Sequence, residues 1–366
     1  MKLKNGSDII KKSSVRAFNR GRGEWQMRGR SDTTIYDISQ RAGVSIATVS
    51  RVINRSVAVS EKTRERVLQV MEESGYTPNA FARGLGLNTM KTIGLLCADV
   101  SDAFMAEAIS FLEKELRNHG YDSLLCCTGT LMKNRKKSLE LLLSKHVDGV
   151  ILVGSNYVSM EREHNTYILS AAHKKPIIIL NARLDGENVY CAYCDDKAAT
   201  MSATQKLLED GKRRVLYLYH ARTYSGMKKL EGYKQAHEHM GVPFQEELVV
   251  ECSTGDGIQE IQALLEGSVS KGLAFDAIMT ATDDMAVGAL KYARAAHRTI
   301  PEDLQIVGFN NSSLCLCTEP ELSSVDNKLQ SLCQNCVSTL MGVLEGKDMP
   351  KYSIFSGELV RRGTTA

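Results

Sequence analysis

The sequence predicts an α/β core of two lobes, preceded by an all-α head of three short helices. From Thr92 onward, apolar blocks of strand length alternate with amphipathic stretches, a pattern typical of parallel sheets covered by helices. The blocks are Ile93–Cys97, Leu124–Cys127, Gly149–Val153, Ile177–Leu180, Val215–Tyr219, Leu248–Cys252, Ala277–Thr280 and Gln305–Phe309. Because this region is larger than one comfortable hydrophobic core, we expect two lobes.

Composition excludes several classes of protein. With 366 residues, 43% hydrophobic and 24% charged, the chain is neither disordered throughout nor collagen-like. It contains no apolar run of the ~18 residues that a membrane helix needs. The N-terminus is basic and has no apolar segment of the kind found in signal peptides, so we expect a cytoplasmic protein. Ten cysteines in so long a chain predict free thiols rather than a disulfide scaffold.

Charge is distributed unevenly along the chain. Residues 1–30 hold nine Lys and Arg against two acids, a charge of +7, whereas the chain beyond residue 91 carries −6. A basic head on a mildly acidic body indicates that the head meets a polyanion. Residues 1–31 lack periodicity and are expected to be a disordered extension; the alternative for this basic segment is a solubilising tail without a partner.

Residues 32–78 predict the helices of the head. Thr34 and Asp37 have the spacing of a capping box, which opens a helix through about Arg41. Gly43 permits the tight turn that ends this helix. A helix, a turn with glycine and a second helix form the helix-turn-helix layout.

Two serines are expected to cap the remaining helices. Ser45 caps the second helix, whose Val49 and Val52 turn inward, and Ser60 caps the third, which stops at Gly75.

The second helix has the residues that a DNA recognition helix needs. Its outward positions are Ile46, Ala47, Ser50 and Arg51. Arg51 can form a bidentate pair with guanine, worth ~1–3 kcal/mol of discrimination, while Ile46 and Ala47 can contact thymine methyl groups or respond to DNA shape. The alternative is a three-helix bundle without a role on DNA.

A weak helical segment follows the head. Asn79–Leu87 contains Gly84 and Gly86, and nine residues with two glycines are too few to hold a helix in isolation. We expect residues 79–91 to be a hinge helix and linker.

The chain resembles the lactose-repressor (LacI) family of bacterial transcription regulators. The match is densest in Ala42–Asn54 and Tyr76–Leu85 and covers Thr33–Ala366. The resemblance implies that Asn79–Leu85 folds on operator DNA, where Leu85 wedges into the minor groove and kinks the duplex. Gly84 departs from the family pattern and weakens this helix by ~1 kcal/mol. The expected DNA-binding residues are Thr34, Tyr36, Ser45, Ile46, Ala47, Thr48, Ser50, Arg51, Asn54, Asn79, Ala82 and Leu85.

The core resembles a periplasmic sugar-binding protein, which implies two α/β lobes joined by three crossing strands. The expected N-lobe is about 92–192 plus 325–348, and the C-lobe about 193–324 plus 349–366. Ligands bind beyond the carboxyl ends of parallel strands. The loops expected to line the cleft are those after Cys97, Val153, Leu180, Tyr219, Cys252, Thr280 and Phe309.

Five residues are the candidate effector-binding set. By resemblance, Lys229 replaces the arginine usual in the family, Asp283 replaces an asparagine and Asn310 replaces an aspartate. Phe104 and Tyr157 are candidates to stack on a ring. Because each replacement changes hydrogen-bonding capacity, a sugar or glycoside is the leading expectation and a cationic, nucleoside-like or phosphorylated effector is the alternative.

Two cysteine pairs are candidates for a metal or redox site. Cys191 with Cys194 and Cys333 with Cys336 form CxxC motifs, but some 140 residues separate them, and structural zinc sites usually draw closer pairs. No dinucleotide fingerprint, Walker loop or nucleophile elbow is present. We therefore expect no metal, no cofactor and no catalysis.

These observations predict a homodimeric repressor of a carbohydrate-use operon that a small sugar-like effector releases from double-stranded operator DNA. The chain has no heptad tail that would build a tetramer. Two alternatives stay open: a regulator whose non-sugar effector acts as a co-repressor, and a solute-sensing binding protein without DNA function.

Overall fold

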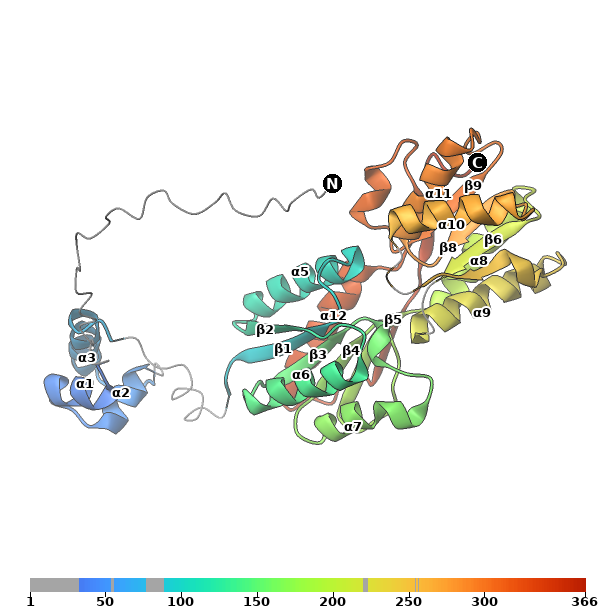
Figure 1. The fold of residues 1–366 in the computed structure, drawn as a ribbon. Helices are drawn as coiled ribbons and strands as arrows, with labels where there is room; N and C mark the ends of the chain where they lie inside the picture. The colour runs from blue at the N-terminus through green and yellow to red at the C-terminus, as the bar shows by residue number, and fades with distance from the viewer. Residues whose placement is uncertain (1–32, 54–55, 77–88, 220–222, 254, 256) are drawn as a thin grey trace, which may run out of the picture. The chain divides into compact units, whose positions relative to one another are not determined.

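The computed structural model describes residues 33–53, 56–76, 89–219, 223–253, 255 and 257–366. The chain divides into two compact units, residues 1–79 and residues 80–366 (Figure 1). The predicted extension, the hinge with Ala82 and Leu85, and the candidates Asn54 and Asn79 lie outside the described residues.

The head contains three helices, as predicted: α1 (Ile35–Ala42), α2 (Ile46–Ile53) and α3 (Glu61–Glu73). The Thr34 capping box is present, with the Thr34 hydroxyl donating to the Asp37 carboxylate at 2.7 Å. Gly43 ends α1 at φ +63°, where a side chain would be strained. The helices enclose a small core of Ile38, Ala42, Val49, Val52, Val59 and Val67.

The two predicted serine caps behave differently. Ser45 Oγ accepts the Thr48 N–H at 3.1 Å and caps α2. Ser60 stands at the start of α3, but its hydroxyl lies 2.9 Å from the hydroxyl of Thr63 and caps no backbone group. The Thr63 N–H reaches the Ser60 carbonyl oxygen instead, so the predicted side-chain cap at Ser60 is wrong.

Each lobe of the core is built on a six-stranded sheet. The N-lobe sheet is parallel, in the order β11-β5-β4-β3-β1-β2. Its strands are β1 (Thr92–Cys97), β2 (Asp122–Cys127), β3 (Gly149–Val153), β4 (Ile177–Leu180), β5 (Val189–Cys194) and β11 (Tyr352–Phe355).

The C-lobe sheet has the order β12-β10-β9-β8-β6-β7, and only β12 is antiparallel to its neighbour. Its strands are β6 (Val215–Tyr219), β7 (Val249–Glu251), β8 (Ala277–Thr280), β9 (Gln305–Phe309), β10 (Ser323–Asp326) and β12 (Glu358–Val360).

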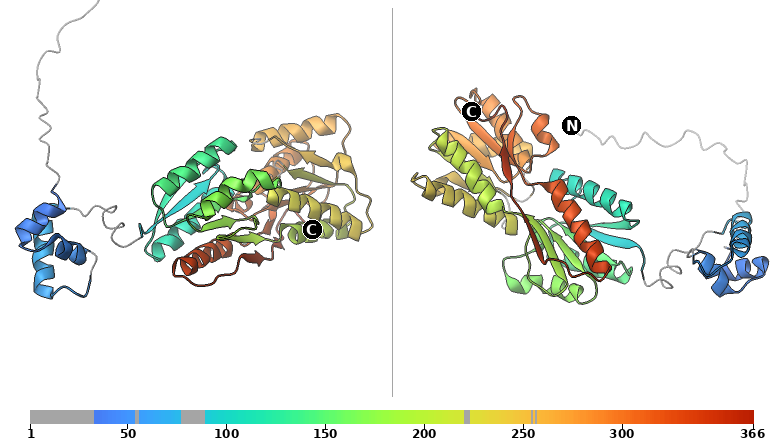
Figure 2. Two further views of the ribbon diagram at one scale, coloured as in Figure 1. Left: turned by 90° about the horizontal axis from the view of Figure 1, so that it is seen from below. Right: turned by 180° about the vertical axis from the view of Figure 1, so that it is seen from behind.

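Helices cover both faces of each sheet (Figures 1 and 2). In the N-lobe, α5 and α12 pack side by side on one face and α6 and α7 on the other. In the C-lobe, α8 packs against α9 and α10 against α11. The helices are α5 (Ala103–Asn118), α6 (Met132–Ser144), α7 (Thr166–Ala172), α8 (Asp196–Glu209), α9 (Tyr224–His239), α10 (Ile258–Ser270), α11 (Asp283–Ala295) and α12 (Leu329–Leu344). Short 3-10 turns are η1 (Ser155–Tyr157), η2 (Arg162–Asn165), η3 (Glu246–Leu248) and η4 (Ser313–Leu316).

The chain crosses between the lobes three times: from β5 to α8, from β10 to α12 and from β11 to β12. The predicted boundary at residue 349 is wrong, because β11 pairs in parallel with β5 and so belongs to the N-lobe. The crossing comes only after Phe355. Strand β11 lies at the edge of its sheet and is incompletely buried. It therefore lacks the continuous apolar block by which the sequence marks the central strands.

Among the described residues, no helix has both the length and the apolar composition to cross a membrane.

Candidate DNA-binding surface and ligand cavity

Helix α2 presents a mixed surface outward. Val49 and Val52 are buried, whereas Ala47 and Arg51 are exposed and Ile46 is 39% exposed. Thr48 and Ser50, also on this helix, are half-buried. The inward and outward positions predicted from helical periodicity are therefore confirmed for these valines and for Ile46, Ala47 and Arg51. Their contacts with DNA stay a prediction.

The start of α1 adds two further candidates. Tyr36 is 68% exposed, an unusual exposure for a large aromatic side chain and one that suits a partner surface. Thr34 is engaged within the helix cap: its backbone N–H and its hydroxyl both donate to Asp37 and lower the pKa of that carboxyl. A contact between the Thr34 side chain and a phosphate would share this hydroxyl with the cap.

A cavity of about 690 Å³ lies between the lobes at the carboxyl ends of the strands. All seven loops predicted to line it do so, and the loop after β2 adds Thr130. The volume falls within the range of ~300–1,000 Å³ usual for small-molecule sites. Phe104, Lys229, Asp283 and Asn310, four of the five predicted effector residues, are in its lining.

Lys229 is a buried cation in the cavity wall. It projects from α9 and is only 5% exposed. Its Nζ donates to the Ala281 carbonyl oxygen at 2.9 Å and lies 3.6 Å from the centre of the Phe309 ring. Burial lowers the pKa of Lys229, and the charge of Asp196 opposes that shift. A buried ammonium with so few partners favours a ligand that brings oxygen acceptors.

Asp283 lies at the start of α11 and is 2% exposed. Its carboxylate accepts from the Ser312 N–H at 2.7 Å and from the Ser324 hydroxyl at 2.5 Å. Burial raises the pKa of Asp283, and these hydrogen bonds oppose the shift. A Cβ at position 308 would collide with the carboxylate. Only glycine at this position leaves room for the Asp283 side chain. This carboxylate joins α11 to β10 and the loop after β9.

Asn310 follows β9 with φ +102°, a backbone conformation that non-glycine residues seldom adopt. Its side-chain oxygen accepts from the Asn327 amide at 3.0 Å. Asn327 comes directly after β10 in the crossing to α12, so Asn310 links the cavity wall to an interlobe connection.

Of the two aromatic candidates, only Phe104 lies in the cavity lining. Phe104 is half-buried at the start of α5 and lines the cavity. Tyr157 is fully buried among N-lobe hydrophobic residues, with its hydroxyl 3.0 Å from that of Thr128. The prediction that Tyr157 stacks on a ligand is wrong for this structure, because the ring has no surface open to the cavity.

Four polar groups that the sequence did not single out lie in the cavity lining. They are Asn156 Oδ1, Asn181 Oδ1, Thr282 Oγ1 and Ser312 Oγ, each buried without a hydrogen-bond partner among the described residues. Asn181 directly follows the apolar β4, and Thr282 comes two residues after β8. Polar residues just beyond such strands were therefore an available signal.

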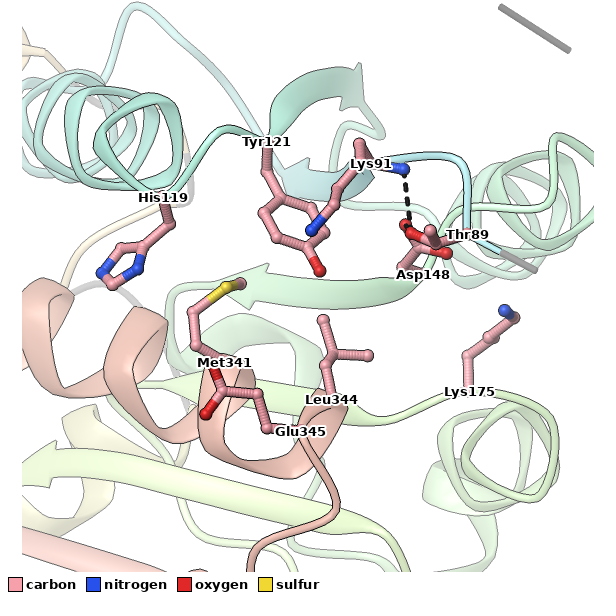
Figure 3. A pocket seen from close by; sticks show the side chains of 9 residues that line it. All are labelled: Thr89, Lys91, His119, Tyr121, Asp148, Lys175, Met341, Leu344 and Glu345. Carbon is pink, nitrogen blue, oxygen red and sulfur yellow. Dashed lines mark hydrogen bonds between the residues drawn. The ribbon is translucent and has the colours of Figure 1, made fainter. Parts of the chain in front are cut away.

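A second cavity, of about 450 Å³, lies at the opposite ends of the N-lobe strands (Figure 3). Its wall includes Asp148, whose carboxylate accepts from the Thr89 hydroxyl at 2.7 Å and from the N–H groups of Met90 and Thr92 at 3.1 and 3.3 Å. Thr89 is the first described residue after 77–88. Asp148 thus anchors the incoming chain to the start of β3.

The two CxxC motifs do not come together as a zinc site. Cys191, Cys194, Cys333 and Cys336 are buried free thiols. Cys191 lies in one hydrophobic cluster of the N-lobe, Cys333 and Cys336 in the other, and Cys194 in the cluster of the C-lobe. Within the described residues, no group of three or more ligating side chains could hold a metal ion.

Comparison with known proteins agrees with this architecture. Residues 34–79 match the model of bacterial regulatory proteins of the lacI family, and residues 90–349 match that of periplasmic binding proteins and the sugar binding domain of the LacI family. The chain is 49% identical over 331 residues to an HTH-type transcriptional regulator of Lachnoclostridium phytofermentans, covering 90% of this chain and 99% of that protein. It is 33% identical to the ribose operon repressor of Halalkalibacterium halodurans, covering 91% and 97%. The lac repressor dimer bound to operator and the anti-inducer ONPF superposes with a TM-score of 0.79 at 21% identity, covering 91% and 98%.

A helix-turn-helix head joined to a two-lobed core with an interlobe cavity defines a ligand-responsive DNA-binding regulator. The chain belongs to the LacI family of bacterial transcription regulators. It is a transcription factor and not an enzyme.

Proposed function

We propose that this protein is a cytoplasmic homodimeric repressor that a small neutral carbohydrate releases from its operator. Two heads bind the half-sites of a near-palindromic operator, so that the symmetry of the DNA mirrors that of the dimer. In each head, α2 contacts the major groove, and the segment containing Leu85 contacts the minor groove. The carbohydrate binds in the cavity between the lobes.

The observation that carries the proposal is the set of unpartnered polar groups in the cavity wall. Asn156, Asn181, Thr282 and Ser312 line the cavity, and each holds a buried side-chain oxygen without a hydrogen-bond partner among the described residues. A buried polar group without a partner costs ~1–3 kcal/mol. A polyhydroxyl ligand removes this cost, because each sugar hydroxyl both donates and accepts.

The charge of the cavity favours a neutral ligand over a phosphorylated one. Of the described lining residues, Lys229 is the only Lys or Arg, whereas four are aspartates: Asp99, Asp102, Asp283 and Asp284. A phosphate group would meet more negative than positive charge in this wall. The ribose operon repressor among the relatives also supports a carbohydrate.

The proposed coupling runs from the cavity to the linker through the N-lobe. Closure of the lobes on a ligand moves the N-lobe, and Asp148 fixes the incoming chain to the same sheet. Such coupling is typically worth ~1–3 kcal/mol, and it is reciprocal, so operator DNA must alter effector affinity by the same factor.

A thermal-shift screen of the full chain tests the ligand class. Neutral sugars, glycosides, sugar phosphates and nucleosides are compared; a ligand at 100 times its dissociation constant stabilises the folded state by ~2.7 kcal/mol. We expect a neutral sugar or glycoside to raise the unfolding temperature and to weaken operator binding. Stabilisation by sugar phosphates or nucleosides alone contradicts the proposed ligand, and tighter operator binding makes the effector a co-repressor.

Leu85→Ala separates a DNA-binding regulator from a solute-sensing protein without DNA function. The variant should lose operator affinity and keep the thermal shift produced by the sugar. Unchanged operator affinity would refute the role given to Leu85.

A further inference from the structure

Two cysteines lie opposite each other at the carboxyl ends of β1 and β2. Cys97 is the last residue of β1 and Cys127 the last residue of β2, and the parallel register pairs them directly. Their sulfur atoms are 3.7 Å apart. Neighbouring strands are separated by ~4.7–4.9 Å, which falls within the Cα separation of ~4.4–6.8 Å that disulfides require.

We propose that Cys97 and Cys127 form a reversible intramolecular disulfide, a redox-sensitive site next to the loops that line the interlobe cavity. The two thiols have complementary environments. Cys127 is exposed on the edge strand of the sheet, whereas Cys97 is fully buried. A peroxide therefore meets Cys127 first, and Cys97 lies within reach as the resolving thiol.

The chemistry is a two-electron oxidation by a peroxide such as hydrogen peroxide. The Cys127 thiol loses its proton to solvent, and the thiolate attacks one peroxide oxygen. The O–O bond breaks, a sulfenic acid forms, and the hydroxide that leaves takes up a proton from solvent to become water. The Cys97 sulfur then attacks the Cys127 sulfur, the S–O bond breaks, and the hydroxyl leaves as a second water with the proton of Cys97. Burial raises the pKa of Cys97 to about 12, which assigns the first attack to Cys127.

The bond would fix a part of the structure that lines the cavity. The Thr128 N–H donates to the Cys97 carbonyl oxygen and the Gly129 N–H to that of Ala98, both at 2.9 Å. Ala98 and Thr130 line the cavity. A covalent link between β1 and β2 at this point holds the two loops in one relative position and reduces their freedom to move when a ligand binds. Disulfides of this kind in reducing compartments are typically transient and redox-sensing.

The neighbouring Cys126 offers a matched control. It precedes Cys127 in β2 and pairs with Leu96, so its side chain points to the opposite face of the sheet. Trypsin places Cys97 in the peptide 92–114 and both Cys126 and Cys127 in the peptide 118–133. The variants Cys126→Ser and Cys127→Ser therefore identify which thiol reacts.

The experiment uses the reduced full chain treated with hydrogen peroxide and digested without reductant. We expect peptides 92–114 and 118–133 to be joined, with the loss of two hydrogen atoms and of two titratable thiols, all restored by dithiothreitol. Cys126→Ser should form the same link and Cys127→Ser should not. Hydrogen exchange of residues 98–105 should slow in the oxidised wild type and stay unchanged in oxidised Cys127→Ser.

Three results would overturn the proposal: Cys127 oxidised to sulfinic acid with Cys97 still reduced, a Cys127 link between two chains, or a link that survives in Cys127→Ser. Because Cys127 is exposed, its replacement by serine does not threaten folding. In Cys97→Ala, the sulfenic acid at Cys127 should accumulate and react with dimedone, and its absence would also contradict the mechanism.

Discussion

The recognition helix and the interlobe cavity present their polar groups in opposite ways. Helix α2 is eight residues long, and its exposed candidate contacts Ile46, Ala47 and Arg51 lie on the side away from the buried Val49 and Val52. The cavity gathers its wall from loops that follow β1 to β4, β6, and β7 to β9, and some of its key groups are more than nine-tenths buried. The first surface is open to a large partner, whereas the second is a recess of the size usual for a small-molecule site.

This difference changes what a substitution does. Exposed residues of α2 can be replaced with little effect on folding, because surface changes usually alter stability by less than ~0.5 kcal/mol. A buried residue of the cavity also supports its neighbours, as Asp283 does for Ser312 and Ser324. Variants of the head should therefore separate binding from stability, whereas variants of the cavity should affect both.

Arg51→Ala should show the largest effect. Loss of a bidentate guanine contact costs ~1–3 kcal/mol, and the proposed dimer carries two copies, so we expect a loss of ~2–6 kcal/mol in operator binding. Fluorescence anisotropy with labelled operator at fixed salt measures it. Arg41→Ala, an exposed arginine of α1, controls for general charge. Equal losses in the two variants would remove Arg51 from base recognition.

Lys229→Met tests the buried cation of the cavity. The variant keeps the apolar stem and removes a charge-assisted hydrogen bond worth ~1.5–3 kcal/mol, so sugar affinity measured by calorimetry should fall at least ~10-fold. Operator affinity without the sugar should stay unchanged. Lys228→Met is the matched control, because Lys228 pairs with Glu231 at the surface, where ion pairs contribute little. Normal sugar affinity in Lys229→Met would place the ligand away from this side chain.

The difference between a surface on one helix and a cavity built from many loops also decides what the sequence could predict. In the head, helical periodicity assigned Val49 and Val52 inward and Arg51 outward, because one helix sets the direction of every side chain. In the core, the rule for parallel strands located all seven predicted loops of the cavity. It did not give side-chain directions: Tyr157, four residues after the end of β3, is buried in the core, whereas Asn181 lines the cavity.

The errors share a physical cause. The Ser60 hydroxyl pairs with the hydroxyl of Thr63 and therefore does not cap the helix. Strand β11 belongs to the N-lobe because it pairs with β5, a strand more than 150 residues earlier in the chain. Side-chain rotamers and distant strand pairing depend on tertiary contacts that no local pattern contains.

Asp148→Asn should have a smaller effect, on coupling rather than on binding. The amide keeps one acceptor oxygen and loses the other, which leaves either the Met90 N–H or the donors of Thr89 and Thr92 without their acceptor, at a cost of ~1–3 kcal/mol for an unpaired group. We expect a lower unfolding temperature and a smaller change in operator affinity when the sugar is added. Asp122→Asn, an exposed carboxylate at the start of β2, serves as the control. Full coupling in Asp148→Asn would show that the linker responds by another route.

Asp283→Asn should have the smallest effect and a distinctive pH dependence. Burial raises the pKa of Asp283 above 3.8 in the folded protein. Between the unfolded and folded pKa values, the folded carboxyl keeps its proton while the unfolded one ionises, so the free energy of unfolding falls as pH rises through this window. Asparagine does not titrate, so the free energy of unfolding of the variant does not fall for this reason as pH rises. The variant should therefore gain stability relative to the wild type as pH rises.

Urea unfolding of both proteins from about pH 4 to pH 7 measures this difference, because a constant offset from the amide itself cancels along the series. The gain should level off above the folded pKa of Asp283. Curves that stay parallel across the range would mean that the Ser312 and Ser324 hydrogen bonds fully offset burial. Curves that converge with rising pH would mean that these bonds outweigh burial, and the Asp283 carboxylate would then stabilise the C-lobe as an anion.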